Sequence, residues 1–261
     1  MASENHSSQM KRLLRIMERL RDPERGCEWD RAQTFDTIAP YTIEEAYEVA
    51  DAIERKDLAE LKFELGDLLL QVVFHSQMAA EADAFTFDDV ARAISDKMER
   101  RHPHIFGEET GAMTNQRWED LKAAERDDAG SSSALDGVAK ALPALMRSDK
   151  LQKRAARVGF QWDDVSGPKE KLEEELEELE TASDDERLME AGDVLFVAVN
   201  IVRRYGVDPE AALKASNSKF EQRFRRMEVL AQSNGQDFAT LSLDEQEAYW
   251  QKVKALEKAQ G

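Results

Sequence analysis

Five acidic side chains in the first third of the sequence are spaced as metal ligands on two helices would be. Glu44, Glu45 and Glu48 stand at positions i, i+1 and i+4. Glu64 and Asp67 follow at i and i+3. Residues three or four apart share one face of a helix, and carboxylate oxygens are the ligands that Mg²⁺ and Mn²⁺ prefer. The same spacing is typical of a solvated acidic helix, so the surroundings of these acids must decide between the two interpretations.

The second pair of acids lies in a segment that is apolar nearly all round. Residues 61–74 read LKFELGDLLLQVVF. A helix with apolar residues on every side is expected to be buried, and a buried carboxylate is costly unless it is paired, protonated or bound to metal. Glu64 and Asp67 are therefore predicted to be buried beside a cation. Gly66 lies between them, and a glycine inside a helix lowers the helix stability by about 1 kcal/mol relative to alanine. Its presence indicates either the close approach of a ligand or tight helix packing.

The acids recur in the second half of the chain as part of a longer internal repeat. Five blocks match in the same order, which chance does not explain: 26–30 with 159–163, 44–48 with 174–178, 64–68 with 190–194, 97–101 with 219–223, and 118–122 with 250–254. The second set of acids consists of Glu174, Glu175, Glu178, Glu190 and Asp193, and Gly192 repeats Gly66. Two acidic helices facing each other in each half predict one metal site in each half.

Paired basic residues also recur in both halves. Lys97 and Arg101 stand four residues apart, and so do Lys219 and Arg223. Each pair places two positive charges on one helix face, where they could hold phosphate groups. A salt-bridged surface face explains the spacing equally well.

Two further pairs combine a tryptophan with a lysine at helical spacing. They are Trp118 with Lys122, and Trp250 with Lys254. The ring could stack on a base while the lysine meets a phosphate, although tryptophan at this spacing more often lies in a core. Asn200 follows Asp193 by seven residues, which is two helical turns, and could reach the same ligand. Trp29 and Trp162 each follow a glycine in a connecting segment and are interpreted as structural.

The segments that carry these residues predict an all-α fold of two domains. Apolar residues recur at helical spacing over five segments of the first half, namely 10–21, 43–55, 58–81, 86–101 and 116–126. Asp57 is a candidate N-cap for the third of them. No alternating strand pattern occurs. Small polar residues mark a linker over 129–137, so the predicted domains are 1–128 and 138–261, each a bundle of four helices.

Composition excludes several classes of function. The net charge of −18 disfavours binding to a nucleic acid polymer. A single cysteine rules out an intrachain disulfide and fits a reducing, cytoplasmic setting. Neither an apolar leader nor a stretch long enough to span a membrane is apparent, and P-loop, Rossmann and nucleophile-elbow motifs are absent. A di-iron site would need two Glu-x-x-His pairs, and only Glu99 with His102 has that spacing.

The motif Glu-Glu-x-x-Glu followed by Glu-x-x-Asp resembles the all-α nucleotide pyrophosphohydrolase superfamily, which includes MazG and the dimeric dUTPases. Longer stretches are similar to MazG itself, and the similarity extends over nearly the whole chain: 20–23, 26–30, 33–35, 39–45, 101–106, 158–162, 217–220 and 223–224. The gap between the two acid motifs differs between the copies, with fifteen residues between Glu48 and Glu64 and eleven between Glu178 and Glu190.

This resemblance implies a homodimer of tandem helical domains that converts nucleoside triphosphates to monophosphate and pyrophosphate with Mg²⁺, for which Mn²⁺ could substitute. It implies metal ligands at the five acids of each copy and phosphate ligands at the Lys/Arg pairs, with Trp250 and Lys254 closing over the nucleotide. Glu175, and Glu45 in the first copy, are the candidates to orient or deprotonate the attacking water. Stacking on tryptophan would tolerate any base, so a broad role in cleaning the nucleotide pool is expected.

Two other hypotheses stay open from the sequence. A nucleotide or metal sensor on the same fold would bind without turnover. A helical scaffold would use its acids only for solubility, and the predicted burial of the Glu-x-x-Asp acids argues against it. Only the scaffold should be indifferent to Mg²⁺ and to nucleotide.

Overall fold

The computed structural model describes residues 3–107, 114, 117–118, 121 and 132–260. The chain divides into two compact units, Met1–Glu125 and Arg126–Gly261. Every regular element in the described residues is a helix, which confirms the predicted all-α class. The predicted domain boundaries and the tandem repeat stay predictions.

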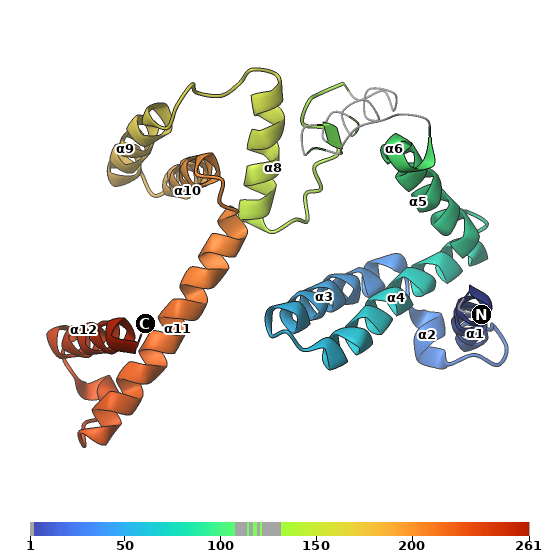
Figure 1. Cartoon of the computed structure of the whole chain (residues 1–261), viewed down its shortest axis with the longest axis horizontal. Coiled ribbons are helices and arrows are strands. Elements are labelled where there is room, and N and C mark those ends of the chain that lie inside the picture. Colours follow the sequence, from blue (N-terminus) through green and yellow to red (C-terminus); the bar gives the residue numbers. More distant parts are fainter. Residues whose placement is uncertain (1–2, 108–113, 115–116, 119–120, 122–131, 261) are drawn as a thin grey trace. The chain divides into compact units, whose positions relative to one another are not determined.

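The first unit is built around a pair of long antiparallel helices, α3 and α4 (Figure 1). Helix α1 packs against α4. Helix α5 contacts α4 and the short α6. The described helices of this unit are α1 Ser3–Leu20, α2 Glu28–Ala32, α3 Phe35–Glu54, α4 Leu58–Glu81, α5 Phe87–Arg101 and α6 Pro103–Phe106.

Local capping signals set the ends of the two long helices. Asp57 caps α4 by accepting hydrogen bonds from the backbone N–H groups of Ala59 and Glu60, as the sequence predicts. Helix α3 begins eight residues earlier than predicted, because Thr34 and Thr37 form a reciprocal capping box ahead of Pro40. Pro40 lies inside this helix, where its missing N–H removes one backbone hydrogen bond, and the helix continues through it.

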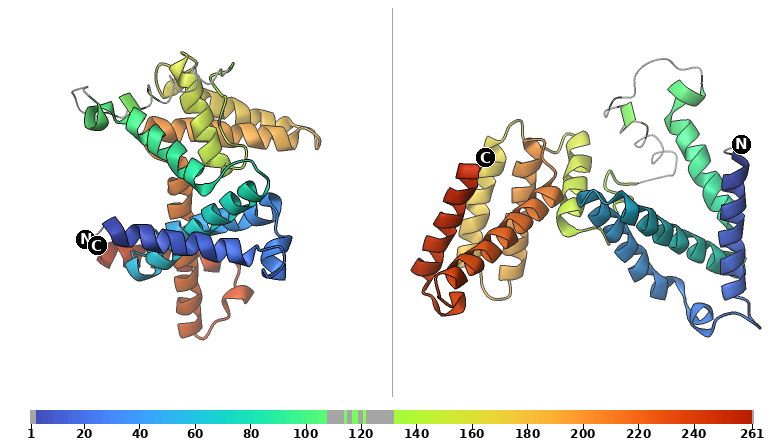
Figure 2. Two further views of the ribbon diagram at one scale, coloured as in Figure 1. Left: turned by 90° about the vertical axis from the view of Figure 1, so that its right-hand side faces the viewer. Right: turned by 60° about the horizontal axis from the view of Figure 1, so that its bottom comes forward.

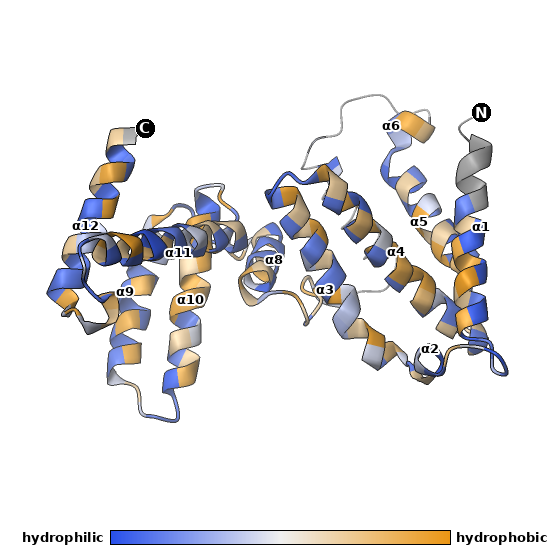
Figure 3. Cartoon of the chain, turned by 90° about the horizontal axis from the view of Figure 1, so that it is seen from below, coloured by the Kyte–Doolittle hydropathy of each residue, from blue (hydrophilic) through white to orange (hydrophobic). Residues whose placement is uncertain are grey.

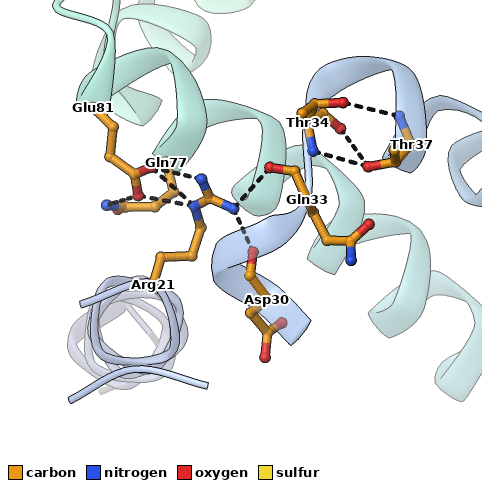
Figure 4. Close-up of polar contacts among 7 residues, drawn as sticks. All are labelled: Arg21, Asp30, Gln33, Thr34, Thr37, Gln77 and Glu81. Carbon is orange, nitrogen blue, oxygen red and sulfur yellow. Dashed lines mark hydrogen bonds and ion pairs between the residues drawn. The ribbon is translucent and has the colours of Figure 1, made fainter. Parts of the chain in front are cut away.

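A buried arginine ties the start of α3 to the rest of the first unit (Figure 4). Arg21 is 8% exposed and forms an ion pair of 2.7 Å with Glu81 at the end of α4. Its guanidinium also donates to the backbone carbonyls of Asp30 and Gln33. The pair lowers the pKa of Glu81. These bonds hold the loop before α3 in place, and so they help to fix the position of the acids that α3 carries.

Below this arginine, the core of the first unit joins α1, α3 and α4. Its buried side chains are Met17, Ile38, Val73, Phe74 and Met78. The three α4 residues in this core, like the other buried residues of α4, belong to the second half of that helix, so the core lies away from the acids of α4.

The second unit contains a similar helix pair, α9 and α10, and a second pair, α11 and α12 (Figures 1 and 2). Helix α8 packs against α10 and α11. Its helices are α8 Ala144–Arg157, α9 Ser166–Thr181, α10 Arg187–Arg204, α11 Pro209–Ser233, the 3₁₀ turn η1 Phe238–Thr240 and α12 Leu243–Gln260. A compact core between α11 and α12 buries Met227, Ala231, Tyr249 and Val253.

The two tryptophans interpreted as structural differ in their surroundings. Trp162 accepts a hydrogen bond at its carbonyl from Arg204, and a Cβ at Gly167 would collide with its indole ring. Trp29 is 54% exposed and meets the ring of Tyr41 edge-on at 6.5 Å. Trp162 is itself 41% exposed, so exposure does not separate the two; the contacts with Arg204 and Gly167 are what support the structural interpretation of Trp162.

Hydrophobic residues recur along the acid-bearing helices (Figure 3), and several of them are exposed within a single chain. Phe63 and Leu65 of α4 are 61% and 49% exposed, and Leu188 and Leu195 of α10 are 83% and 60% exposed. The prediction that the residue 61–74 segment is buried is therefore wrong for its first half, whose residues are exposed or only partly buried. No helix in the described part of the chain is long and apolar enough to cross a membrane.

Candidate metal and phosphate site

In the first unit, three of the predicted acids converge between α3 and α4. Glu45 and Glu48 come from α3, and Glu64 comes from α4; one carboxylate oxygen of each lies within 4.8 Å of the others. The side chain of Gln71, one of the few buried polar groups, donates to Glu45 at 3.5 Å. A group of three oxygen ligands with this spacing fits a hard divalent cation.

Two carboxylates of this first cluster, Glu45 and Glu64, have raised pKa values. Partial burial raises the pKa of Glu45 above its ordinary 4.5, and the charges of Asp67 and Glu48 raise it further. The pKa of Glu64 is raised in the same way, by desolvation and then by Glu48. Carboxylates that repel each other here would be relieved by a cation among them.

The second unit forms an equivalent cluster from a slightly different choice of acids. Glu175 of α9 meets Glu190 and Asp193 of α10, again with one oxygen of each within 4.8 Å of the others. Glu175 is 5% exposed, whereas Asp193 is exposed. The sequence predicted burial for the Glu-x-x-Asp acids, but Asp67 and Asp193 are exposed and the α9 glutamate is the buried one.

Lys171, which sequence reasoning missed, lies directly on the second cluster. Its Nζ is 2.8 Å from Glu175 Oε1 and 2.8 Å from Glu174 Oε1. These contacts raise the pKa of the lysine. The available signal was its position, four residues before Glu175 on one helix face. In the first copy the matching residue, three before Glu44, is Tyr41.

The other predicted acids lie at the margins of the two clusters. Glu44 and Glu174 are exposed and belong to neither group of three. Asp67 acts on the first cluster through its charge on Glu45. Desolvation raises the pKa of Glu178, which Glu175 also raises and Lys171 lowers.

The predicted basic and aromatic residues meet in the same way in both units. The guanidinium carbon of Arg101 lies 5.2 Å from the centre of the Trp118 ring, and Arg223 lies 5.2 Å from Trp250. This distance is typical of a cation–π contact. Arg223 also forms an ion pair of 2.8 Å with Glu257.

The remaining predicted residues are less closely connected. Lys219 is exposed, and Lys97 and Lys254 are partly buried. Asn200 is buried at 6% exposure, and its Oδ1 accepts no hydrogen bond from any described residue. Lys122 lies outside the described residues. In the described part of the second unit, no hydrogen bond or ion pair joins the acids of α9 and α10 to the basic residues of α11 and α12.

Comparison with known proteins identifies the family of this arrangement. Residues 33–106 match the MazG nucleotide pyrophosphohydrolase domain, a range that contains the whole first cluster. The chain is 48% identical to the nucleoside triphosphate pyrophosphohydrolase of Escherichia coli, over 96% of this chain and 98% of that protein. It is 47% identical to the nucleoside triphosphate pyrophosphohydrolase/pyrophosphatase MazG of Thermotoga maritima, over 93% and 94% of the two chains.

Proposed function

The chain belongs to the MazG family of nucleotide pyrophosphohydrolases, and from this premise we propose that it hydrolyses nucleoside triphosphates to nucleoside monophosphate and pyrophosphate. The observation that carries the proposal is the pair of carboxylate clusters, each held between two antiparallel helices. A general solubility function would not require three like charges within 4.8 Å of one another at matching places in both units. The names of the two relatives support the same reaction.

We further propose that the clusters hold Mg²⁺, with Mn²⁺ as a substitute. All the converging groups are carboxylates, which suit these hard cations better than zinc or copper. When bound, such a cation supplies charge neutralisation at the phosphoryl oxygens and activation of water.

In this proposal Glu175 orients the attacking water and accepts its proton. It is the most buried acid of either cluster, and Lys171 fixes its carboxylate from one side. The water oxygen forms a bond to phosphorus, the anhydride bond between the α- and β-phosphates breaks, and pyrophosphate leaves with the bonding electrons. Glu45 holds the matching position in the first cluster.

Arg223 and Lys219 neutralise the charge that develops on the leaving pyrophosphate. Trp250 lies beside Arg223 and offers a ring on which a base of any kind could stack, so we expect broad base tolerance. Lys254 follows Trp250 by one turn and extends the positive surface. In this proposal the basic residues of α11 and α12 bind the same nucleotide as the acids of α9 and α10.

We also propose that the active form is a homodimer. The helices that carry the acids expose large apolar side chains, among them Phe63, Leu188 and Leu195. Contiguous apolar surface on a protein usually marks an interface. A second copy would cover it and would complete the burial that the sequence predicts for these helices.

The deciding experiment incubates the purified chain with ribo- and deoxynucleoside triphosphates, with and without Mg²⁺, and quantifies pyrophosphate and monophosphate. Glu175→Gln and Glu45→Gln each remove one charge from one cluster. Glu173→Gln, an exposed neighbour on α9, is the matched control. We expect Mg²⁺-dependent release that Glu175→Gln abolishes and Glu173→Gln leaves intact. Nucleotide binding without release from any substrate would refute the enzyme and favour a sensor.

A further inference from the structure

One carboxylate on α12 faces a row of cations on α11. Glu257 accepts hydrogen bonds from Arg223 Nε at 3.0 Å and Nη2 at 2.8 Å, both on its Oε2. Its Oε1 also accepts a bond of 3.4 Å from Arg226. Together with Lys219, these cations lower the pKa of Glu257, with the bonds from Arg223 as the largest cause. Glu257 is therefore ionised at neutral pH.

The contact fixes one edge of the Arg223 guanidinium and one of its faces. Glu257 occupies the Nε–Nη2 edge, and the ring of Trp250 covers the face. The opposite nitrogen, Nη1, has no hydrogen-bond partner in the described part of the chain, so its two N–H groups stay available for an anion. Trp250 and Glu257 are seven residues apart on α12, which places both on the face that meets α11.

The same residues recur in the first copy of the repeat. Residues 250–257 read WQKVKALE, and 118–125 read WEDLKAAE. A glutamate thus follows the tryptophan by seven residues in both copies, although most positions between them differ. The first-copy glutamate, Glu125, lies outside the described residues. The recurrence would not be expected of an incidental surface ion pair.

We propose that Glu257 is a positioning residue, which holds Arg223 so that its Nη1 edge points at the phosphates of the substrate. This inference rests on the proposed function of Arg223 as a phosphate ligand. An arginine side chain that is already held on one edge and one face loses little conformational freedom when it binds phosphate. It is therefore aligned before the anhydride bond breaks. The negative charge of Glu257 itself opposes phosphate binding, so orientation and attraction act in opposite directions.

This opposition gives Glu257→Gln a kinetic signature. The amide oxygen can still accept from Arg223, but those bonds lose the charge of the carboxylate and the amide nitrogen cannot accept from Arg226. We therefore expect kcat to fall about five- to tenfold, less than the loss of a whole stabilising donor costs. KM should stay constant or decrease, because a charge that repels phosphate has gone. Glu257→Asp, which keeps the charge and one acceptor contact, should recover part of kcat. Loss of packing alone would instead raise KM and lower the Tm.

The matched control is Glu221→Gln, which breaks the exposed ion pair with Arg225 on the same α11 helix and should leave both constants unchanged. In an Arg223→Ala background, Glu257→Gln should change kcat by less than about twofold, since it acts through that arginine. An equal loss in both backgrounds, or no loss in the active wild-type background, would overturn the inference. Failure of the proposed function is distinct, because then the wild-type chain and Glu221→Gln release no pyrophosphate.

Discussion

Magnesium should stabilise the folded chain, and the stabilisation should grow as the pH rises. The reason lies in the first cluster, where burial and mutual repulsion hold the pKa values of Glu45 and Glu64 above 4.5. The folded chain then keeps protons that the unfolded chain has already lost. Without metal, the free energy of unfolding therefore falls as the pH rises through this window. A divalent cation replaces those protons and removes the penalty.

The expected size follows from linkage. A ligand at one hundred times its dissociation constant stabilises the folded state by about 2.7 kcal/mol per site. In a unit of this length, 1 kcal/mol corresponds to roughly 4 °C in Tm, so saturating Mg²⁺ should raise the Tm by about 10 °C near neutral pH. Well below pH 4.5, Glu45 and Glu64 are protonated in both states, so the Mg²⁺ shift of the first unit should nearly vanish.

Thermal unfolding followed by circular dichroism tests this prediction, with NaCl at equal ionic strength in place of Mg²⁺. Glu45→Gln should remove the shift from the first unit and Glu175→Gln from the second, while Glu173→Gln should preserve both. A shift of equal size in the double variant would place the metal elsewhere. A shift that does not depend on pH would show that these carboxylates are not its ligands.

Three other substitutions test separate parts of the structure. Arg21→Ala leaves two backbone carbonyls without this donor and Glu81 with Gln77 as its remaining one, so chemical unfolding should show the first unit destabilised by about 1–3 kcal/mol; a loss no greater than that of the exposed Arg19→Ala would contradict this account. Lys171→Met removes a cation from the second cluster and should tighten Mn²⁺ binding several-fold in calorimetry, whereas unchanged or weaker binding would mean that the lysine and the metal do not share Glu175. Gly192→Ala meets no atom within 4 Å in a single chain and should favour the helix by about 1 kcal/mol, but it should weaken the proposed dimer in sedimentation equilibrium; a dimer of unchanged strength would place the interface on another face.

Local signals made the helix that carries Glu64 predictable from the sequence. The bounds of α4 and its Asp57 cap follow from an apolar period that begins directly after a capping residue. The start of α3 did not follow, because the predicted helix begins only at residue 43 and α3 begins at Phe35. Only the reciprocal bonds between Thr34 and Thr37 explain why the helix begins there.

Burial was harder to predict. An apolar helix indicates that another surface covers it, but the sequence does not say which surface that is. The acids of α4 and α10 were expected inside the chain, yet Asp67 and Asp193 are exposed beside uncovered apolar side chains. If a second copy covers those side chains, the sequence signal reflects the assembly and not the single chain. Lys171 was not predicted for a related reason: the spacing of the acids indicates a metal site but not the lysine that pairs with Glu174 and Glu175.

The two clusters are similar in ligand type and different in charge, which bears on what each would do. In the second unit, Lys171 lies against Glu174 and Glu175, so its acids already share one positive charge. The first unit has the uncharged Tyr41 at the matching position, and two of its acids have raised pKa values. A bare divalent cation gains more from the first arrangement. A triphosphate carries about four negative charges of its own, so it should bind more favourably at the second cluster, where Lys171 lies beside the buried Glu175. We therefore expect the second unit to dominate turnover and the first to bind metal more tightly.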